Sequence, residues 1–244
     1  MNKTFYWFCT ISLIAMILIV LNSLVGDAVF MIRYGFAKAN TTTNKIIETS
    51  KDPIQVNTDG KEYIRFFGNK NEFALNVRAN YSISGIVITT NTNFWFRDVM
   101  RNKFDEVCLI DFGMVWGDLA KDIKLLHKNW KFKSYKSIGM SRRLEWRSRP
   151  PHEQIWSKDY FNEHISHTHL IPANENVMGA LLKVKEDDLV KLDGYLVDIY
   201  DAKTSQLIAK TSMTRKDRDV NSRGSGACEN MYVTRIQLED KIYE

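Results

Sequence analysis

The sequence predicts an α+β fold: a mainly antiparallel sheet or small β-barrel with one or two short flanking helices, preceded by one N-terminal transmembrane helix. Three observations predict it: an uncharged apolar run at the start, several aromatic and β-branched segments between turn residues, and a long hairpin pattern near the end. We therefore divide the chain into a signal-anchor helix at 1–26, a polar spacer at 27–62 and a single α+β soluble domain at 63–244.

The apolar run spans residues 5–25 and reads FYWFCTISLIAMILIVLNSLV, which is 21 residues without a charge. At about 1.5 Å per residue, a helix of this length crosses roughly 30 Å of hydrocarbon. The residues after it, Asn22 to Gly26, form a poor signal-peptidase site, so we expect an uncleaved anchor. The chain is then a single-pass protein of the cell membrane.

The orientation of the anchor rests on two opposing signals. Arg33, Lys38 and Lys45 outnumber Lys3, and the positive-inside rule alone would keep their flank in the cytoplasm. However, a short basic start, an apolar run and a large folded domain form the usual signal-anchor layout, and large domains cross largely regardless of charge. We expect an extracytoplasmic domain, with the cytoplasmic orientation as the alternative.

The composition, with 44% hydrophobic and 26% charged residues, is that of a globular protein and excludes wholesale disorder. Cys9 lies in the apolar run, which leaves Cys108 and Cys228 as the possible disulfide pair. Two cysteines are too few for a disulfide scaffold and do not have the spacing of a structural zinc site. The redox compartment stays open, and no cofactor is expected.

The soluble domain is expected to begin near Tyr63, after a Thr- and Asn-rich stretch over 38–61. Three strands follow, at 63–68, 73–79 and 81–90, and the last two are separated by a turn at Ala79-Asn80.

Two short helices are predicted from capping residues and apolar spacing. Asp118 can cap one helix with Leu119, Ile123 and Leu126 at its apolar positions, which turns the neighbouring lysines toward solvent. The other helix runs from Asn174 to Val184, with an apolar stripe at Val177, Leu181 and Leu182.

The clearest strand signal is a hairpin, in which 188–200 and 206–213 flank a turn at 201–205. Its first strand is apolar on both faces near Gly194, which fits a strand that bends inside a barrel or between two layers. A last strand is predicted at 231–238.

A basic stretch over 121–149 contains ten lysines and arginines against Asp122 and Glu145, a local net charge of +8. It could contact anionic lipid, a cell-wall polymer or another envelope protein, whereas nucleic acid is not expected as a partner of an outward-facing domain. A solvated basic face is the alternative. The candidate surface consists of Lys131, Lys133, Arg142, Arg143, Trp130 and Trp146.

Three histidines lie close together, at His164, His167 and His169, and imidazoles at such spacing can bind zinc. On a strand His167 and His169 share a face, whereas on a helix His164 pairs with His167. A metal would need a further ligand, such as Asp159, His152 or Cys228. Ordinary polar histidines are the alternative.

Cys228 follows a glycine-rich segment and is a candidate nucleophile. The layout of anchor, β-rich domain, histidine, cysteine and later arginine resembles that of sortase transpeptidases. The resemblance implies His169, Cys228 and Arg235 as catalytic residues. The Thr-Leu-x-Thr-Cys run of that family is absent, and in a regular strand Arg235 faces away from Cys228. A small buried core cysteine is the alternative.

Five segments stand out together: YSISG at 81–85, VWG at 115–117, HLIPA at 169–173, LDGYLV at 192–197 and GACE at 226–229. They resemble an uncharacterised family of bacterial single-pass membrane-anchored proteins, from about residue 63 onward. The resemblance implies one domain and no established activity. We expect a membrane-anchored extracytoplasmic binding or assembly module without enzyme activity. The alternative is a cysteine-dependent transpeptidase or hydrolase, or a metal-dependent hydrolase.

Overall fold

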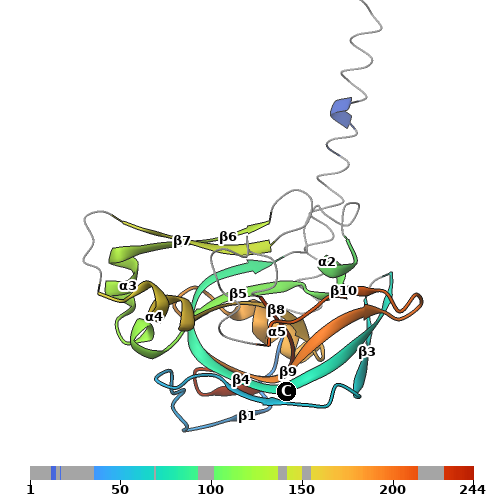
Figure 1. The fold of residues 1–244 in the computed structure, drawn as a ribbon, viewed down its shortest axis with the longest axis horizontal. Helices are drawn as coiled ribbons and strands as arrows, with labels where there is room; N and C mark the ends of the chain where they lie inside the picture. Colours follow the sequence, from blue (N-terminus) through green and yellow to red (C-terminus); the bar gives the residue numbers. More distant parts are fainter. Residues whose placement is uncertain are drawn as a thin grey trace, which may run out of the picture.

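The computed structural model describes residues 12–14, 17, 36–68, 70–92, 102–136, 142–149, 155–213 and 228–244 (Figure 1). The anchor predicted at 5–25 lies outside this part of the chain, apart from residues 12–14 and 17. Among the described residues, no helix combines the length and the apolar character needed to span a membrane.

Five strands pair into a closed ring, because β11 bonds to both β8 and β9. The β8–β11 pairing is parallel and the others in the ring are antiparallel. The mainly antiparallel α+β fold is therefore confirmed, and Figure 1 shows β4 and β9 as long curved neighbours. In ring order the strands are β4 (Glu72–Thr92), β5 (Ile110–Val115), β8 (Ile165–Pro172), β11 (Glu229–Leu238) and β9 (Leu189–Asp201).

Shorter strands extend this ring at its edges. β1 (Thr41–Thr42) pairs with β12 (Lys241–Tyr243), and β12 pairs with β11. β2 (Ile54–Asn57) and β3 (Tyr63–Phe67) pair with β4, and β10 (Leu207–Ala209) pairs with β9. The prediction of a spacer over 27–62 is therefore wrong for β1 and β2. These edge strands are short and largely exposed, so they lack the apolar signal of a core strand.

β4 is one continuous strand of 21 residues, so the turn predicted at Ala79-Asn80 is wrong. Its pairing with β9 shifts between Val77 and Ala79, which marks a β-bulge. A bulge bends a strand and adds one residue to it. Val77 accordingly packs in one core cluster and Ala79 in another.

The described helices are short: α2 (Lys103–Val107), η1 (Gly117–Ala120), α3 (Ile123–Asn129), α4 (Lys158–Glu163) and α5 (Glu175–Lys183). Asn174 caps α5 as predicted, and Val177 and Leu181 are buried in the main core. The cap predicted at Asp118 is wrong, because Asp118 lies within the 3-10 turn η1 and Asp122 caps α3 instead.

The main core cluster fills the ring and includes side chains from α5. At Gly194, β9 approaches β11 so closely that a Cβ would lie 2.0 Å from the carbonyl oxygen of Tyr232. The sequence predicts a bend at this glycine, and the structure shows that glycine is needed there because the backbones of β9 and β11 come into close contact. Outside the ring, β6 (Trp130–Lys136) and β7 (Arg142–Ser148) form a separate two-stranded sheet.

Candidate active site

Strand β8 places His167 and His169 on one face, opposite to Leu170 of the main core. His164 lies before the strand, at the C-terminal cap of α4, where its ring stacks on Tyr160 at 3.8 Å between centroids. Of the two geometries considered for this segment, the strand geometry is therefore the one observed, and the metal-ligand set that includes His164 is not assembled.

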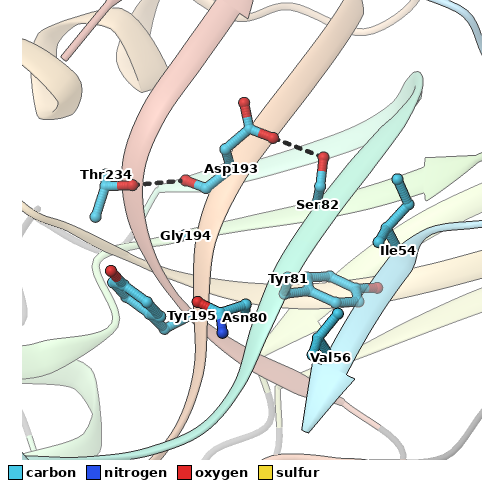
Figure 2. Close-up of a pocket in the computed structure, with 9 residues that line it drawn as sticks. All are labelled: Ile54, Val56, Asn80, Tyr81, Ser82, Asp193, Gly194, Tyr195 and Thr234. Carbon is cyan, nitrogen blue, oxygen red and sulfur yellow. Dashed lines mark hydrogen bonds between the residues drawn. The ribbon is translucent and has the colours of Figure 1, made fainter. Parts of the chain in front are cut away.

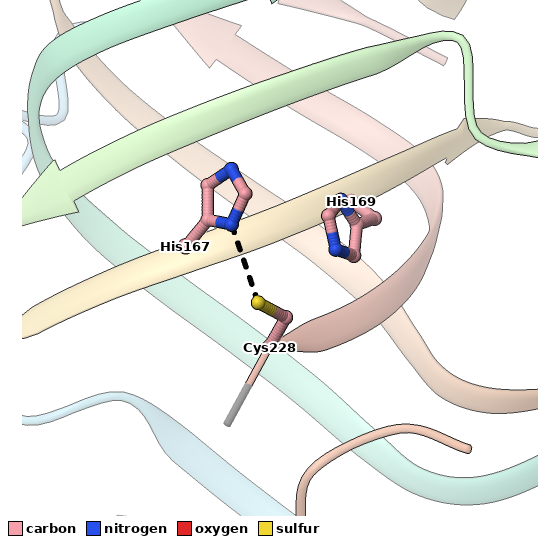
Figure 3. Close-up of side chains that lie close together, drawn as sticks. All are labelled: His167, His169 and Cys228. Atoms are coloured by element: carbon pink, nitrogen blue, oxygen red, sulfur yellow. Dashed lines mark hydrogen bonds between the residues drawn. The ribbon is translucent and has the colours of Figure 1, made fainter. Parts of the chain in front are cut away.

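Cys228 is brought to the two histidines by the parallel pairing of β11 with β8. Glu229 lies opposite Thr168, so the preceding residue, Cys228, comes beside His167. Figure 3 shows its thiol next to the two imidazole rings, with His167 Nδ1 3.2 Å from Cys228 Sγ. One donor atom from each of these three side chains lies within 4.8 Å of the others.

Asp111 completes the cluster from β5, where it pairs in register with His169. His169 Nδ1 lies 2.7 Å from Asp111 Oδ1, which leaves the Nε2 atom of His169 for the thiol side of the ring. Arg142 Nη1 lies 3.1 Å from the same carboxylate oxygen, and the side chains of Asp111 and Arg142 are 0% and 1% exposed. The order of contacts is guanidinium, carboxylate, imidazole and thiol.

Charge within the cluster reverses the effect of burial on Cys228. Burial raises the pKa of its thiol, but His167 and His169 outweigh this and lower the pKa to about 6. Burial likewise disfavours the His169 imidazolium, but Asp111 and Cys228 raise its pKa to about 9. Between pH 6 and pH 9 the favoured state is therefore a thiolate beside an imidazolium.

Asp111 stays ionised throughout this range. Burial raises the pKa of its carboxyl group, but His169 and Arg142 lower it to about 2. Phe104 of α2 covers the other side of the site, with its ring edge-on to His169 at 5.0 Å and the guanidinium of Arg142 over its face at 4.7 Å. These apolar surroundings strengthen the charge interactions.

His167 contributes a second imidazole whose outer nitrogen is unsatisfied. Its Nε2 atom is buried and makes no hydrogen bond within the described part of the chain.

The backbone of Cys228 is also held in place, because the backbone N–H of Ser212 donates to the Cys228 carbonyl at 3.0 Å. The thiol is thus held by the backbone as well as by the histidines.

Arg235 does not join the cluster, so the role implied by the sortase resemblance is wrong. It lies toward the far end of β11, where it pairs with Asp193 at 3.0 Å and Glu244 at 2.8 Å. Cys108 is a buried free thiol, and Cys228 is also free, so the two cysteines form no disulfide. Of the predicted catalytic residues, Cys228 and His169 meet.

The basic stretch divides between surface and interior. Lys131, Lys133 and Arg143 are exposed as predicted. Arg142 is buried against Asp111, so its assignment to a binding surface is wrong. Trp130 and Trp146 are only half-buried but pack toward Phe161, on the opposite side of the hairpin from the lysines, so they do not join a surface with them.

Asp111 is not among the residues singled out from the sequence, and Arg142 is predicted there on a binding surface rather than in this site. Asp111 lies in a run of apolar residues, LIDFGMVW at 109–116, and a carboxylate inside a buried strand is a signal of a paired charge. The partner of that charge came from a distant basic segment, and only the fold brings the two together.

No family model, curated protein or solved structure matches this chain.

A separate pocket lies between β2, β4, β9 and β11 (Figure 2). In it Ser82 Oγ donates to Asp193 Oδ1 at 2.6 Å, and the Thr234 hydroxyl donates to the Asp193 carbonyl at 3.2 Å. It contains no thiol or imidazole and is distinct from the cluster. Its lining residues are Ile54, Val56, Asn80, Tyr81, Ser82, Asp193, Gly194, Tyr195 and Thr234.

Proposed function

We propose that the protein is a cysteine-dependent acyl-transfer enzyme, a hydrolase or transpeptidase, with Cys228 as nucleophile and His169 as its acid–base partner. The observation that carries the proposal is the chain of contacts from Asp111 through His169 to Cys228. A nucleophile, a base within reach and a third group that orients the base form the usual arrangement of covalent catalysis.

The reaction begins from the ion pair. The Cys228 thiolate attacks the carbonyl carbon of an ester, thioester or amide, and a carbon–sulfur bond forms. When the tetrahedral intermediate collapses, the bond to the leaving group breaks and the His169 imidazolium gives that group its proton. Neutral His169 then takes a proton from water or an amine, which attacks the thioester and releases the Cys228 thiolate.

Asp111 and Arg142 act as positioning residues. The Asp111 carboxylate holds the Nδ1 atom of His169, so the opposite nitrogen faces the thiol. Arg142 compensates the buried charge of Asp111, and its Nη1 atom also donates to the Cys108 carbonyl at 2.8 Å. The orientation of the His169 imidazole is therefore fixed by Asp111, which is in turn held by Arg142.

The same three donor atoms would also suit a zinc ion, because two imidazoles and a thiolate are common zinc ligands. In that arrangement Asp111 would orient the His169 ligand through its contact with Nδ1, as carboxylates often do for metal-binding histidines. The metal-dependent hydrolase is thus the second candidate, and His167 and His169 keep the role predicted for them while Cys228 replaces His164.

We propose in addition that residues 5–25 anchor the enzyme in the cell membrane with the domain outside. The proposal is supported by the uncharged composition of that segment. Protease added to intact cells should then digest the domain, and a domain protected until the cells are lysed would contradict this orientation.

The test of the enzyme uses the full chain in detergent, treated with 4-nitrophenyl acetate and examined by intact mass and peptide mapping. We expect an acetyl group on Cys228 in the wild type, none on Cys228→Ala, and normal labelling in the matched control Cys108→Ala. A native Cys228 that reacts only after denaturation would overturn the proposal. Stoichiometric zinc in the purified protein without an acyl adduct would establish the metal site instead.

A further inference from the structure

The hairpin of β6 and β7 has two chemically different faces. Its register places Trp130, Phe132, Leu144 and Trp146 on one side, and these side chains pack in the core cluster that includes Phe161. The apolar face is therefore covered by the protein itself.

The other face carries the charge. Alternation along the strands puts Lys131, Lys133, Arg143, Glu145 and Arg147 together on it. Four cations thus share one carboxylate, and Glu145 contacts Arg143 at 2.6 Å and Arg147 at 3.7 Å. Lys133 lies opposite Glu145 in the strand register, but among the residues that the structure describes neither Lys131 nor Lys133 makes a salt bridge.

One cross-strand pair on this face has no folding rationale. Lys131 lies directly opposite Arg147, and like charges in that position disfavour strand pairing. Such an arrangement is understandable where the face meets a negative partner. Lys133 Nζ lies 4.3 Å from the centroid of the Tyr135 ring, and this cation–π contact holds the Lys133 side chain against the hairpin.

We propose that this cationic face, made of Lys131, Lys133, Arg143 and Arg147, binds the surface of an anionic phospholipid membrane. Charge complementarity is the main argument, because clustered lysines and arginines gain energy from each anionic lipid they approach. The face presents no exposed apolar side chain from the hairpin, so the contact is electrostatic rather than inserted. The membrane anchor proposed at residues 5–25 would also keep this face close to a bilayer.

The test uses the full chain in nanodiscs of phosphatidylcholine, immobilised and exposed to vesicles in solution. We expect capture of vesicles that contain phosphatidylglycerol, weak capture of pure phosphatidylcholine vesicles, and loss of capture at high salt. The double variant Lys131→Gln with Lys133→Gln should bind about fivefold more weakly for each removed charge.

The matched control is Lys203→Gln with Lys210→Gln, which removes the same charge from exposed positions near β10. It should capture vesicles as the wild type does. Equal capture of both vesicle types, or equal loss in both double variants, would overturn the proposal. So would retention of a wall polymer or duplex DNA without retention of anionic vesicles. Cys228 acylation is measured separately and does not depend on this face.

Discussion

Asp111 and His169 lie opposite each other on adjacent antiparallel strands, and their side chains meet at 2.7 Å. Because both residues sit inside regular strands, the orientation of the imidazole is determined by the sheet rather than by a loop. Sites built on such elements hold their geometry more closely than sites on loops. The reactivity of Cys228 should therefore depend on a residue that does not touch it.

The first prediction concerns the pH dependence of Cys228. Its thiol pKa is lowered to about 6 from an ordinary value near 9, so the thiolate should already predominate at neutral pH. The rate of alkylation by iodoacetamide should rise with pH to a plateau with a midpoint near 6. A midpoint near that of a free cysteine in the native protein would show that the histidines do not act on the thiol.

The second prediction concerns Asp111→Asn. The amide keeps the shape of the side chain but removes the charge that stabilises the His169 imidazolium. The Cys228 alkylation midpoint should move to higher pH, and acylation should slow by about a hundredfold or more. Unchanged acylation with an unchanged midpoint would remove Asp111 from the mechanism.

The third prediction compares two neighbouring arginines. Arg142→Gln leaves the buried Asp111 carboxylate without its guanidinium, which should cost about 3–5 kcal/mol in the free energy of unfolding. Arg143→Gln, at an exposed position with its side chain 57% accessible, should change stability by less than about 1 kcal/mol. Urea unfolding of both variants measures the difference, and equal losses would contradict the buried pair.

The fourth prediction concerns stability in acid. The carboxyl pKa of Asp111 is lowered in the folded state to about 2, so its contribution is present above the ordinary value of 3.8 and is lost as pH falls through about 2. The difference corresponds to about 2 kcal/mol. Urea unfolding at a series of pH values should show this loss between pH 4 and pH 2 in the wild type. Asp111→Asn should lack it, and parallel curves for the two proteins would contradict the shift.

The fifth prediction tests the close contact of β9 and β11. Gly194→Ala would place a methyl group 2.0 Å from the Tyr232 carbonyl oxygen, which is backbone and cannot move aside without disturbing the ring. The melting temperature should fall by several degrees, because small-to-large changes of this kind cost about 1–3 kcal/mol. Gly60→Ala is the comparison for backbone strain alone, since Gly60 has a φ of +70° and an added Cβ would meet only ordinary contacts, 3.6 Å from Asn76 Oδ1 and 3.8 Å from Arg78 Nε.

Elements with strong local signals could be predicted from the sequence. The helix after Asn174 has a good cap and an apolar stripe, and the strand through Gly194 is long, rich in aliphatic and aromatic residues and followed by turn residues. β5 could not be found in this way, because all six of its residues are buried and the run shows no alternation.

The candidate site was predictable only in part. The spacing of His167 and His169 indicates a shared strand face, but nothing local indicates that Asp111 and Cys228 lie beside it. Arg142 illustrates the limit most clearly, since it sits among exposed cations in the sequence and is buried in the fold. Burial of a charge depends on its partner, and the partner is distant in the chain.

The closed ring also determines when the thiol becomes reactive. His169 is 58 residues from Asp111, and Cys228 is 61 residues from His167, so the contacts form only after separate stretches of the chain have paired. Long-range strand pairing is a late and slow event in folding. A nascent or misassembled chain would keep a cysteine of ordinary acidity, and nucleophilic strength would appear only with the finished protein. Thiol reactivity would therefore report completed folding. An immature chain would not catalyse acyl transfer to neighbouring molecules.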